Sequence, residues 1–296
     1  MPEVSVIIPN YNHKRYLLQR IESVLGQTFQ DIEVIILDDC STDGSEEIIE
    51  QYRTNRKVAD IIYNKTNSGS TFKQWEKGIR LARGEWVWIA ESDDYCENTF
   101  LKTLLKLAEA KQNVGIAFAN SYWVDDGGLV GEELSIYKES FFREGTDEVK
   151  ELSKHCTIQN ASSCIIKRGH ALQAVQGLSK YKACGDWIFY TRVLQNSNLV
   201  YINSKLNYFR WYHNNVSSKA KEKLWITEGV DVLRNINYSK VFFTPGEFSQ
   251  LIKGWVKKVK QLSLKDGLGS WMTIVYSVFK FYTSGKREHK LTNETF

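Results

Sequence analysis

The chain of 296 residues is long enough for one large domain or about two domains of ordinary size. Apolar residues make up 42% and charged residues 25%, which excludes a disordered chain, a collagen and a coiled coil. The net charge of +4 is uneven: residues 251–296 carry nine Lys or Arg and three Asp or Glu, a balance of +6, so residues 1–250 sum to −2. A mildly acidic body argues against a nucleic-acid partner, and the basic tail suggests contact with an anionic surface.

Short apolar runs and segments with helical spacing alternate through the first 120 residues. Strands are expected at 4–8, 32–37, 61–63, 86–90 and 114–119, and helices at 17–25, 45–52, 72–81 and 99–110. This alternation predicts an α/β unit whose central sheet is mostly parallel and flanked by helices. In such sheets, ligands bind at the carboxyl ends of the strands.

The pattern is less regular after residue 121. Residues 122–157 are expected to form a loop-rich insertion, followed by a strand at 163–166, helices at 169–175 and 186–195, and a strand at 208–212. Residues 222–237 and 246–283 are expected to be mainly helical. We therefore divide the chain into a main domain at 1–225 and a basic, helical C-terminal extension at 226–296.

The cysteines and the apolar segments indicate the cellular compartment in which the protein works. The five cysteines are odd in number and form no C-x-x-C pair, so a disulfide framework or a zinc site is not expected and a reducing cytosol fits best. The first apolar run is too short for a signal peptide. No segment reaches the 18 or so apolar residues of a spanning helix, which favours a cytoplasmic protein.

Acidic residues gather in three clusters, two of which follow predicted strands. The clusters are Asp38-Asp39, Glu91-Ser92-Asp93-Asp94 and Gly185-Asp186-Trp187. Each has an ordinary alternative, because such segments are also typical of helix N-caps and solvated turns. In a functional interpretation, the first cluster accepts the N–H of a nucleobase, since a carboxylate is an acceptor-only group. Adjacent acids repel one another, so the second indicates a site for Mg²⁺ or Mn²⁺.

Signature motifs of several other reaction classes are missing from the sequence. The first strand is not followed by G-x-G-x-x-G, and the chain contains no G-x-x-x-x-G-K-[ST], G-x-S-x-G or H-E-x-x-H. These absences argue against a dinucleotide-binding domain, a P-loop enzyme, an α/β-hydrolase and a zinc protease.

Three segments resemble the family 2 glycosyltransferases: V-S-V-I-I-P-N-Y-N at 4–12, I-L-D-D-C-S-T-D-G-S at 36–45 and A-R-G-E-W-V-W-I-A-E-S-D-D at 82–94. The resemblance covers about residues 1–120 and continues more weakly from 185–186 to Arg210 and His213. It implies the GT-A fold, which is Rossmann-like, and an inverting enzyme that uses a nucleotide-diphospho-sugar. Residues 1–121 would bind the nucleotide sugar and residues 122–225 the acceptor.

The resemblance assigns roles to the residues that would bind the nucleotide. Tyr11, which follows Pro9, would stack on the uracil or thymine. Asp39 would accept a hydrogen bond from the base N3–H, and its neighbour Asp38 is the competing assignment. The usual A-R-N segment after the second helix is replaced here by F-K-Q-W at 72–75, in which Lys73 either supplies the missing positive charge or is simply solvated.

The resemblance also implies a metal site and a base. Asp94 would hold Mg²⁺ or Mn²⁺ on the diphosphate, and Asp93 would contact the ribose or a metal-bound water. The first acid of this motif is Glu91 where many relatives have Asp, so the pair that holds the metal is open. Asp186 falls at the position of the catalytic base. Arg210 and His213 match a late pattern in which a basic residue or a His approaches the diphosphate or the metal.

We therefore expect an inverting transferase that moves one sugar from a UDP-sugar to an acceptor hydroxyl, on a growing lipid-linked or surface glycan. One alternative is a non-catalytic module that binds a nucleotide sugar or a glycan on the same fold. Another is a sugar-1-phosphate nucleotidyltransferase, although residues 9–16 lack the glycine-rich loop that such enzymes use. The donor sugar, the acceptor and the linkage are not encoded in any spacing that we can interpret.

The basic tail carries an apolar face at helical spacing. The face consists of Trp271, Ile274, Val275, Val278, Phe279 and Tyr282, and lysines flank it on both sides. One interpretation is a helix that lies on the inner face of the cell membrane, so that residues 251–290 hold the enzyme there peripherally. The other is a helix that packs the same face on the main domain.

Overall fold

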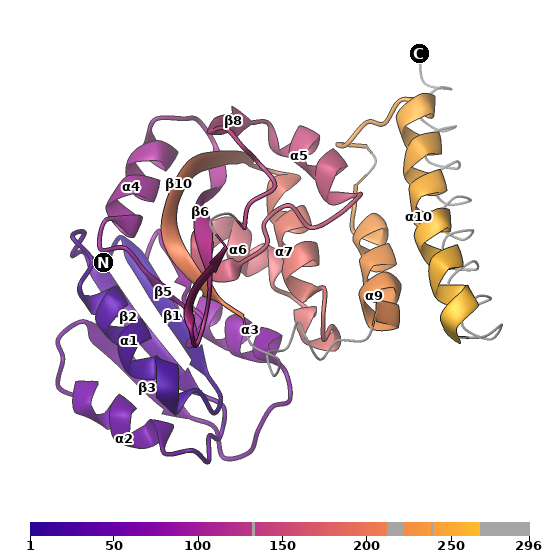
Figure 1. The fold of residues 1–296 in the computed structure, drawn as a ribbon. Helices are drawn as coiled ribbons and strands as arrows, with labels where there is room; N and C mark the ends of the chain where they lie inside the picture. The colour runs from indigo at the N-terminus through magenta and orange to yellow at the C-terminus, as the bar shows by residue number, and fades with distance from the viewer. Residues whose placement is uncertain (132–133, 212–221, 238, 267–296) are drawn as a thin grey trace.

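The structure is a computed structural model in which residues 1–131, 134–211, 222–237 and 239–266 are described (Figure 1). The first half contains β1 (Val4–Asn10), α1 (Lys14–Leu25), β2 (Ile32–Asp38), α2 (Ser45–Ile49), η1 (Glu50–Tyr52), β3 (Val58–Tyr63), α3 (Thr71–Leu81), β4 (Trp86–Ile89), β5 (Tyr95–Cys96) and α4 (Phe100–Glu109). The expected strands and helices of this half are therefore present.

The second half contains β6 (Val114–Asp125), β7 (Gly128–Gly131), β8 (Phe141–Arg143), α5 (Gly145–Leu152), η2 (Ala161–Ser163), β9 (Cys164–Lys167), α6 (Arg168–Ala174), η3 (Leu178–Lys180), α7 (Gly185–Leu194), β10 (Asn198–Arg210), α9 (Glu222–Arg234) and α10 (Pro245–Asp266). The loop-rich insertion expected at 122–157 holds more regular structure than the sequence indicates, because β7, β8 and α5 lie there and β6 extends to Asp125. The strand expected at 208–212 is the end of a longer strand, β10.

One curled sheet has the strand order β3-β2-β1-β4-β9-β6-β10-β5. The strands from β3 to β4 are parallel, as the sequence predicts. Beyond β4 the sheet is mixed, because β9 runs antiparallel to both of its neighbours, β4 and β6, while β6 and β10 are parallel. A fold of this kind places the parallel strand ends, where ligands bind, at one edge.

Helices cover both faces of the sheet, and each face has its own core (Figure 1). Alternate residues of β1 serve the two cores: Ile7 packs with α3 and α7, whereas Val6 and Ile8 pack with α1 and α4. Because both faces are buried, the strand is mostly apolar instead of alternating, and its polar Ser5 donates to Glu33 of β2 (2.6 Å). All seven residues of β1 and of β2 are buried.

The C-terminal helices pack on the second half of the sheet domain. Trp255 of α10 donates its indole N–H to the Ser153 carbonyl (2.8 Å) and stacks on Trp187 of α7 with ring centroids 6.0 Å apart. Within the described part of the chain, no helix is both long and apolar enough to cross a membrane. The apolar face predicted at 271–282 lies outside the described residues. All five cysteines are free, as expected.

Candidate active site

The carboxyl ends of β1, β2 and β4 lie together at one edge of the sheet. Asn10 is in register with Asp38, and the Asp39 N–H donates to the Asn10 carbonyl (2.8 Å). On the other side of β1, the Ala90 N–H donates to the Ile7 carbonyl (2.8 Å). These parallel pairs bring the acidic segments 38–39 and 91–94 to the same edge.

Asp38 organises the loop that follows β1 and β2. One of its oxygens accepts from the Asn10 amide (2.7 Å) and the Ser41 hydroxyl (2.6 Å), and the other accepts from the Ser41 N–H (2.8 Å). Its side chain is buried. These bonds make Asp38 a structural group of the loop, and because its Oδ2 has a single donor, Asp38 still competes with Asp39 for the base contact.

Asp39 is also buried, but its two oxygens are used unequally. Its Oδ1 accepts from the Asn64 amide (2.6 Å), the Ser68 N–H (2.9 Å) and the Gln74 amide (2.9 Å). Its Oδ2 accepts from the Ser68 hydroxyl (2.7 Å). Because a carboxylate oxygen can accept at least two hydrogen bonds, Oδ2 has capacity for a further donor.

The other residues expected at the nucleotide lie near this loop. Pro9 is buried near the end of β1, and the side chain of Tyr11 is 47% exposed just beyond it. Lys73, on the first turn of α3, is exposed and donates to the Ser68 carbonyl (2.9 Å). Its positive charge therefore lies beside the segment that holds Asp39.

Glu91 opens the second acidic cluster and is held by an aromatic side chain. Its carboxylate accepts the indole N–H of Trp75 (2.7 Å), and its own N–H donates to the Ser162 hydroxyl (3.0 Å). Burial, together with the nearby charge of Asp93, raises the pKa of Glu91 to about 8. A carboxyl group with such a pKa is mostly protonated at neutral pH.

Asp93 and Asp94 differ in their exposure. Asp94 is 2% exposed, and its oxygens accept from the Arg210 N–H (2.9 Å) and from the Asn160 amide (2.9 Å). Burial, followed by the charge of Asp93, raises the pKa of Asp94 to about 6. Asp93 remains partly exposed at the surface of the edge.

A buried arginine that we did not predict lies beneath the acids. Arg20 of α1 is fully buried, donates to the Glu91 carbonyl (2.8 Å) and has a terminal nitrogen 3.9 Å from Asp94. Within the described residues, its two terminal nitrogens have no hydrogen-bond acceptor. The guanidinium therefore acts as a resident countercharge for the acidic cluster.

Arg210 reaches the cluster from the end of β10. Its Nε donates to the Asp93 carbonyl (2.9 Å), and its guanidinium lies over the Tyr16 ring, 4.4 Å from the centroid. The structure thus places Arg210 beside the acids, and its role toward a diphosphate stays a prediction. His213 lies outside the described residues.

Asp186, the expected base, lies at the first turn of α7. Its carboxylate accepts the Trp187 N–H (2.7 Å), and the side chain keeps partial exposure. Burial raises the pKa of Asp186 to about 6. A carboxylate with this pKa is ionised at neutral pH and is more basic than an ordinary aspartate, as a general base requires.

The first turn of α3 contacts all three acidic clusters, a role that the sequence did not reveal. Gln74 donates to Asp39, and Trp75 donates to Glu91. Phe72 packs so closely on Gly185 that a Cβ at that position would lie 2.6 Å from the ring. In this segment the sequence pattern draws attention only to the charge of Lys73, whereas the neighbours of Lys73 connect the clusters.

The segment 91–94 fits a divalent cation in kind, because Mg²⁺ and Mn²⁺ prefer carboxylate oxygens. Hydrogen bonds within the fold already occupy both oxygens of Asp94, whereas Asp93 is the more accessible acid. Within the ranges that the structure describes, no three His, Cys, Asp or Glu side chains converge on one point. Asp93, the more accessible of the two acids, is therefore a candidate direct ligand beside Asp94, and the assignment of Asp94 from the motif stays a prediction.

The sequence profile of the family described as "Glycosyl transferase family 2" matches residues 5–169, more than half of the chain. The chain therefore belongs to this family of glycosyltransferases, as the resemblance implied. The glycosyltransferase GlyG of Streptococcus pneumoniae is 32% identical over 123 residues, which are 42% of this chain and 40% of GlyG. The poly(ribitol-phosphate) β-N-acetylglucosaminyltransferase TarS of Staphylococcus aureus is 39% identical over 106 residues, 34% of this chain and 18% of TarS. The aligned part is less than half of either relative.

Solved structures with the same fold include two nucleotide-sugar complexes. Residues 1–349 of S. aureus TarS in complex with UDP-GlcNAc match with a TM-score of 0.71 and 19% identity, over 94% of this chain and 80% of that chain. The mannosyltransferase PcManGT of Pyrobaculum calidifontis in complex with GDP-Man and Mn²⁺ matches with a TM-score of 0.58 and 14% identity, over 96% of this chain and 87% of that chain. At these identities the similarity establishes the GT-A fold.

Proposed function

We propose that the enzyme transfers one sugar from a UDP-sugar to an acceptor hydroxyl with inversion at the anomeric carbon. The observation that carries this proposal is the connection of three acidic clusters through α3, with an accessible Asp93 and a half-buried Asp186. The complex of TarS with UDP-GlcNAc supports a uridine nucleotide. A lipid-linked or surface glycan is the acceptor class that we propose.

The nucleotide end of the donor would lie over the loop at 38–45. We propose that the exposed ring of Tyr11 stacks on the uracil and that Asp39 Oδ2 accepts from the base N3–H. Pro9 lies one residue before the end of β1, and Asp38 shapes the loop. Lys73, exposed beside Ser68, adds positive charge on the same side.

The diphosphate would lie over the segment 91–94. We propose that Asp93 holds Mg²⁺ or Mn²⁺, with Asp94 fixing the strand end and Glu91 completing the acidic surface. When bound, such a cation neutralises the charge that develops on the leaving diphosphate. Arg210 lies at the same place and adds a fixed positive charge, which favours an anionic leaving group.

Asp186 would remove the proton of the acceptor hydroxyl. The acceptor oxygen then bonds to the anomeric carbon as the bond to the diphosphate oxygen breaks, so that UDP leaves and the proton stays on the Asp186 carboxyl. A single displacement inverts the anomeric configuration. Among general bases, a group with a pKa close to the working pH is the most effective.

The test is the variant Asp186→Asn, with UDP release from a panel of UDP-sugars in Mn²⁺ as the readout. We expect activity to fall by about 10²–10⁴-fold, the contribution of a general base. The matched control is Asp147→Asn, since Asp147 is an exposed acid in the first turn of α5. If Asp186→Asn stays within a few-fold of the wild type, the base is another group. Binding without UDP release by the wild type would instead favour a non-catalytic module.

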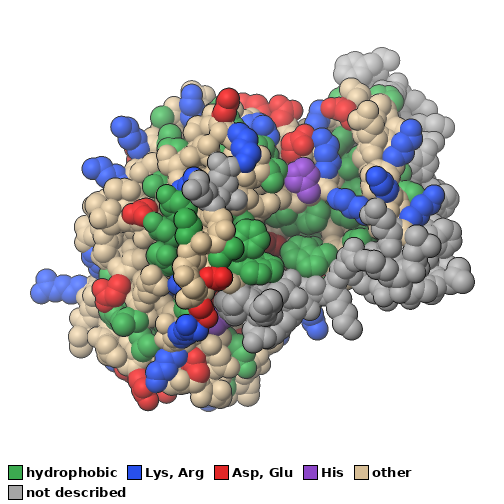
Figure 2. All heavy atoms as spheres, viewed as in Figure 1, with side chains coloured by type: hydrophobic (Ala, Val, Ile, Leu, Met, Phe, Trp, Pro, Cys, Tyr) green, Lys and Arg blue, Asp and Glu red, His purple; other side chains and the backbone are tan. Residues whose placement is uncertain are grey.

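We also propose that the enzyme works in the cytoplasm, peripherally at an anionic membrane, through residues 251–290. Lys253 and Lys257 support this, because they are exposed one turn apart on α10, where basic side chains project from the helix (Figure 2). Each basic residue near an anionic surface contributes about 1 kcal/mol of binding. The full chain should sediment with anionic but not with neutral liposomes at low salt, and Lys253→Glu/Lys257→Glu should weaken this. A wild-type chain that stays in the supernatant with anionic vesicles contradicts the proposal.

A further inference from the structure

The loop that leads into Asp186 is held by a carboxylate from a different helix. Glu228 of α9 accepts the N–H groups of Ala183 (2.8 Å) and Cys184 (2.9 Å) on one oxygen, and the Lys182 N–H (2.9 Å) on the other. Cys184 is the N-cap residue of α7, and its side chain makes no capping hydrogen bond. Glu228 therefore provides the negative charge that successive backbone N–H groups and a helix N-terminus favour.

Close packing fixes α9 against α7, so the position of Glu228 is well defined. The next residue, Gly229, touches two stacked indole rings: a Cβ there would lie 2.8 Å from Trp255 and 3.2 Å from Trp187. Only a residue without a side chain allows α9 to approach this closely. Trp187 is also the residue after Asp186, so the packing and the candidate base share one turn of α7.

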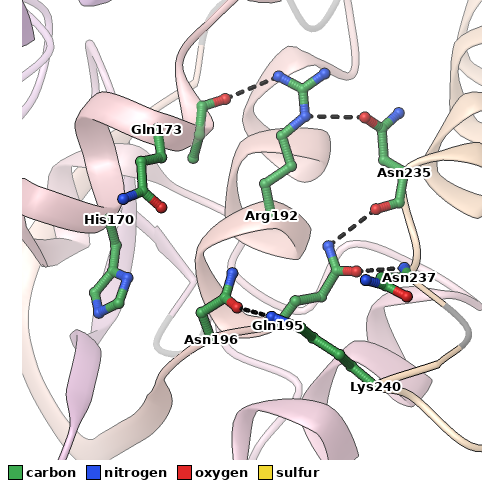
Figure 3. Close-up of a pocket in the computed structure, with 9 residues that line it drawn as sticks. His170, Gln173, Arg192, Gln195, Asn196, Asn235, Asn237 and Lys240 are labelled. Carbon is green, nitrogen blue, oxygen red and sulfur yellow. Dashed lines mark hydrogen bonds between the residues drawn. The ribbon is translucent and has the colours of Figure 1, made fainter.

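A polar network braces the other end of α9 (Figure 3). Arg192 of α7 donates to the Asn235 side chain (2.9 Å), Gln195 donates to the Asn235 carbonyl (2.9 Å), and the Asn237 N–H donates to Gln195. These residues line a hollow of about 260 Å³. The polar groups of these residues bond to one another. This network attaches the end of α9 to the C-terminal end of α7, about nine residues from Asp186.

We infer that Glu228 is a positioning residue for sugar transfer, because it fixes residues 182–184 and thereby the orientation in which Asp186 enters α7. The inference rests on the proposed function, in which Asp186 is the base. Glu228 lies beyond residues 5–169, where the family profile matches. The C-terminal helices are thus part of the catalytic architecture in this chain.

Glu228 also affects the protonation equilibrium of Asp186. Burial is the main reason that the pKa of Asp186 is raised, and the negative charge of Glu228 raises that pKa further. The other ionisable groups that interact with Asp186 are Cys156, Cys164, Cys184 and Tyr190. Burial raises the pKa of each of these four groups, so they stay neutral at pH 5–8. Among the described residues, Glu228 is therefore the charged neighbour that can move the pH dependence.

The experiment compares Glu228→Gln, Glu228→Asp and the control Asp231→Asn in the full chain. Asp231 is on the same helix three residues later and pairs with Arg234 (2.6 Å) instead of the loop. We measure kcat and KM for UDP release, the pH profile, the melting temperature with UDP and Mn²⁺, and hydrogen exchange of the amides at 182–184. Asp186→Asn is measured in parallel.

For Glu228→Gln we expect kcat to fall by about 10–100-fold, as for a displacement of about 1 Å, with an unchanged UDP-induced melting shift. The acidic limb of its profile should move to lower pH, and amide exchange at 182–184 should be faster. Glu228→Asp keeps the negative charge, so the acidic limb of its pH profile should stay at the wild-type pH. Asp231→Asn should match the wild type in every measurement. A Glu228→Gln variant within twofold of the wild type in kcat, or an equal loss in Asp231→Asn, overturns the inference. An active Asp186→Asn instead refutes the proposed base.

Discussion

Replacing Gly185 with alanine tests whether the contact between α3 and α7 holds Asp186 in place. A Cβ at residue 185 would lie 2.6–2.7 Å from three carbons of the Phe72 ring. Phe72 is 4% exposed and meets the Trp75 ring edge-on, with centroids 5.2 Å apart. The ring cannot retreat without disturbing Trp75 and its hydrogen bond to Glu91.

The expected loss of stability in Gly185→Ala follows from this steric overlap. Overpacking a dense core costs about 1–3 kcal/mol, and each kcal/mol lowers the melting temperature of a chain of this size by roughly 2–4 °C. We expect Gly185→Ala to melt roughly 2–12 °C lower, and a shift of Asp186 by about 1 Å to reduce UDP release by about 100-fold. The assays are differential scanning fluorimetry and UDP release from a donor that the wild type consumes.

Gly254→Ala is the matched control, because Gly254 is exposed in the middle of α10 and no atom lies within 4 Å of its added Cβ. There alanine should stabilise the fold by about 0.5–1 kcal/mol and leave UDP release unchanged. If Gly185→Ala melts within about 1 °C of the wild type and keeps full activity, then neither the packing of Phe72 nor its consequence for Asp186 is as we describe.

Three further changes test the acids and their partners. Arg20→Met should lower the melting temperature strongly, since removing one partner of a buried ion pair costs about 3–5 kcal/mol. Mn²⁺ should restore part of this loss. An unchanged melting temperature would contradict the role of Arg20 as a countercharge. Asp39→Ala should abolish the thermal stabilisation by UDP but not the fold, whereas Asp60→Ala, an exposed acid on β3, should retain it. UDP release should fall about tenfold per pH unit below about pH 6, because a base must be deprotonated to act, and a flat profile from pH 5 to 8 would exclude Asp186.

The parallel half of the fold could be predicted because its strands are buried on both faces. Runs 4–8 and 32–37 are apolar except at Ser5 and Glu33, and helices of ordinary length separate such runs. Polar residues directly after those runs then mark the ligand edge. β10 could be predicted only at its end, because its register shifts near Lys205 and its burial changes from four buried residues at its start to a mostly half-buried stretch. Irregular pairing of this kind leaves no simple period in the sequence.

Two site residues illustrate what sequence patterns can and cannot reveal. The buried stripe of α1 consists of positions 17, 20, 21 and 24, so an arginine at position 20 is a charge on an apolar face and could have been noticed. Glu228 gave no such signal. Its partners at 182–184 are more than 40 residues away along the chain. Only the packing of α9 on α7 brings them together.

Asp186 should lower the stability of the folded chain through the same burial that makes it a good base. Its pKa is about 6 in the folded state, against an ordinary value of 3.8, so the folded state binds the proton more tightly than the unfolded chain does. The group therefore costs nothing below about pH 4, and the penalty grows until about pH 6 and then stays constant, at about 3 kcal/mol for two pKa units. Asp186→Asn removes the ionisation and keeps an oxygen for the Trp187 N–H, so the inactive variant should melt above the wild type at pH 8. This difference in melting temperature should shrink as the pH falls toward 4. If the difference is equal at pH 5 and pH 8, or if the variant is less stable than the wild type at pH 8, burial does not set the pKa of this base.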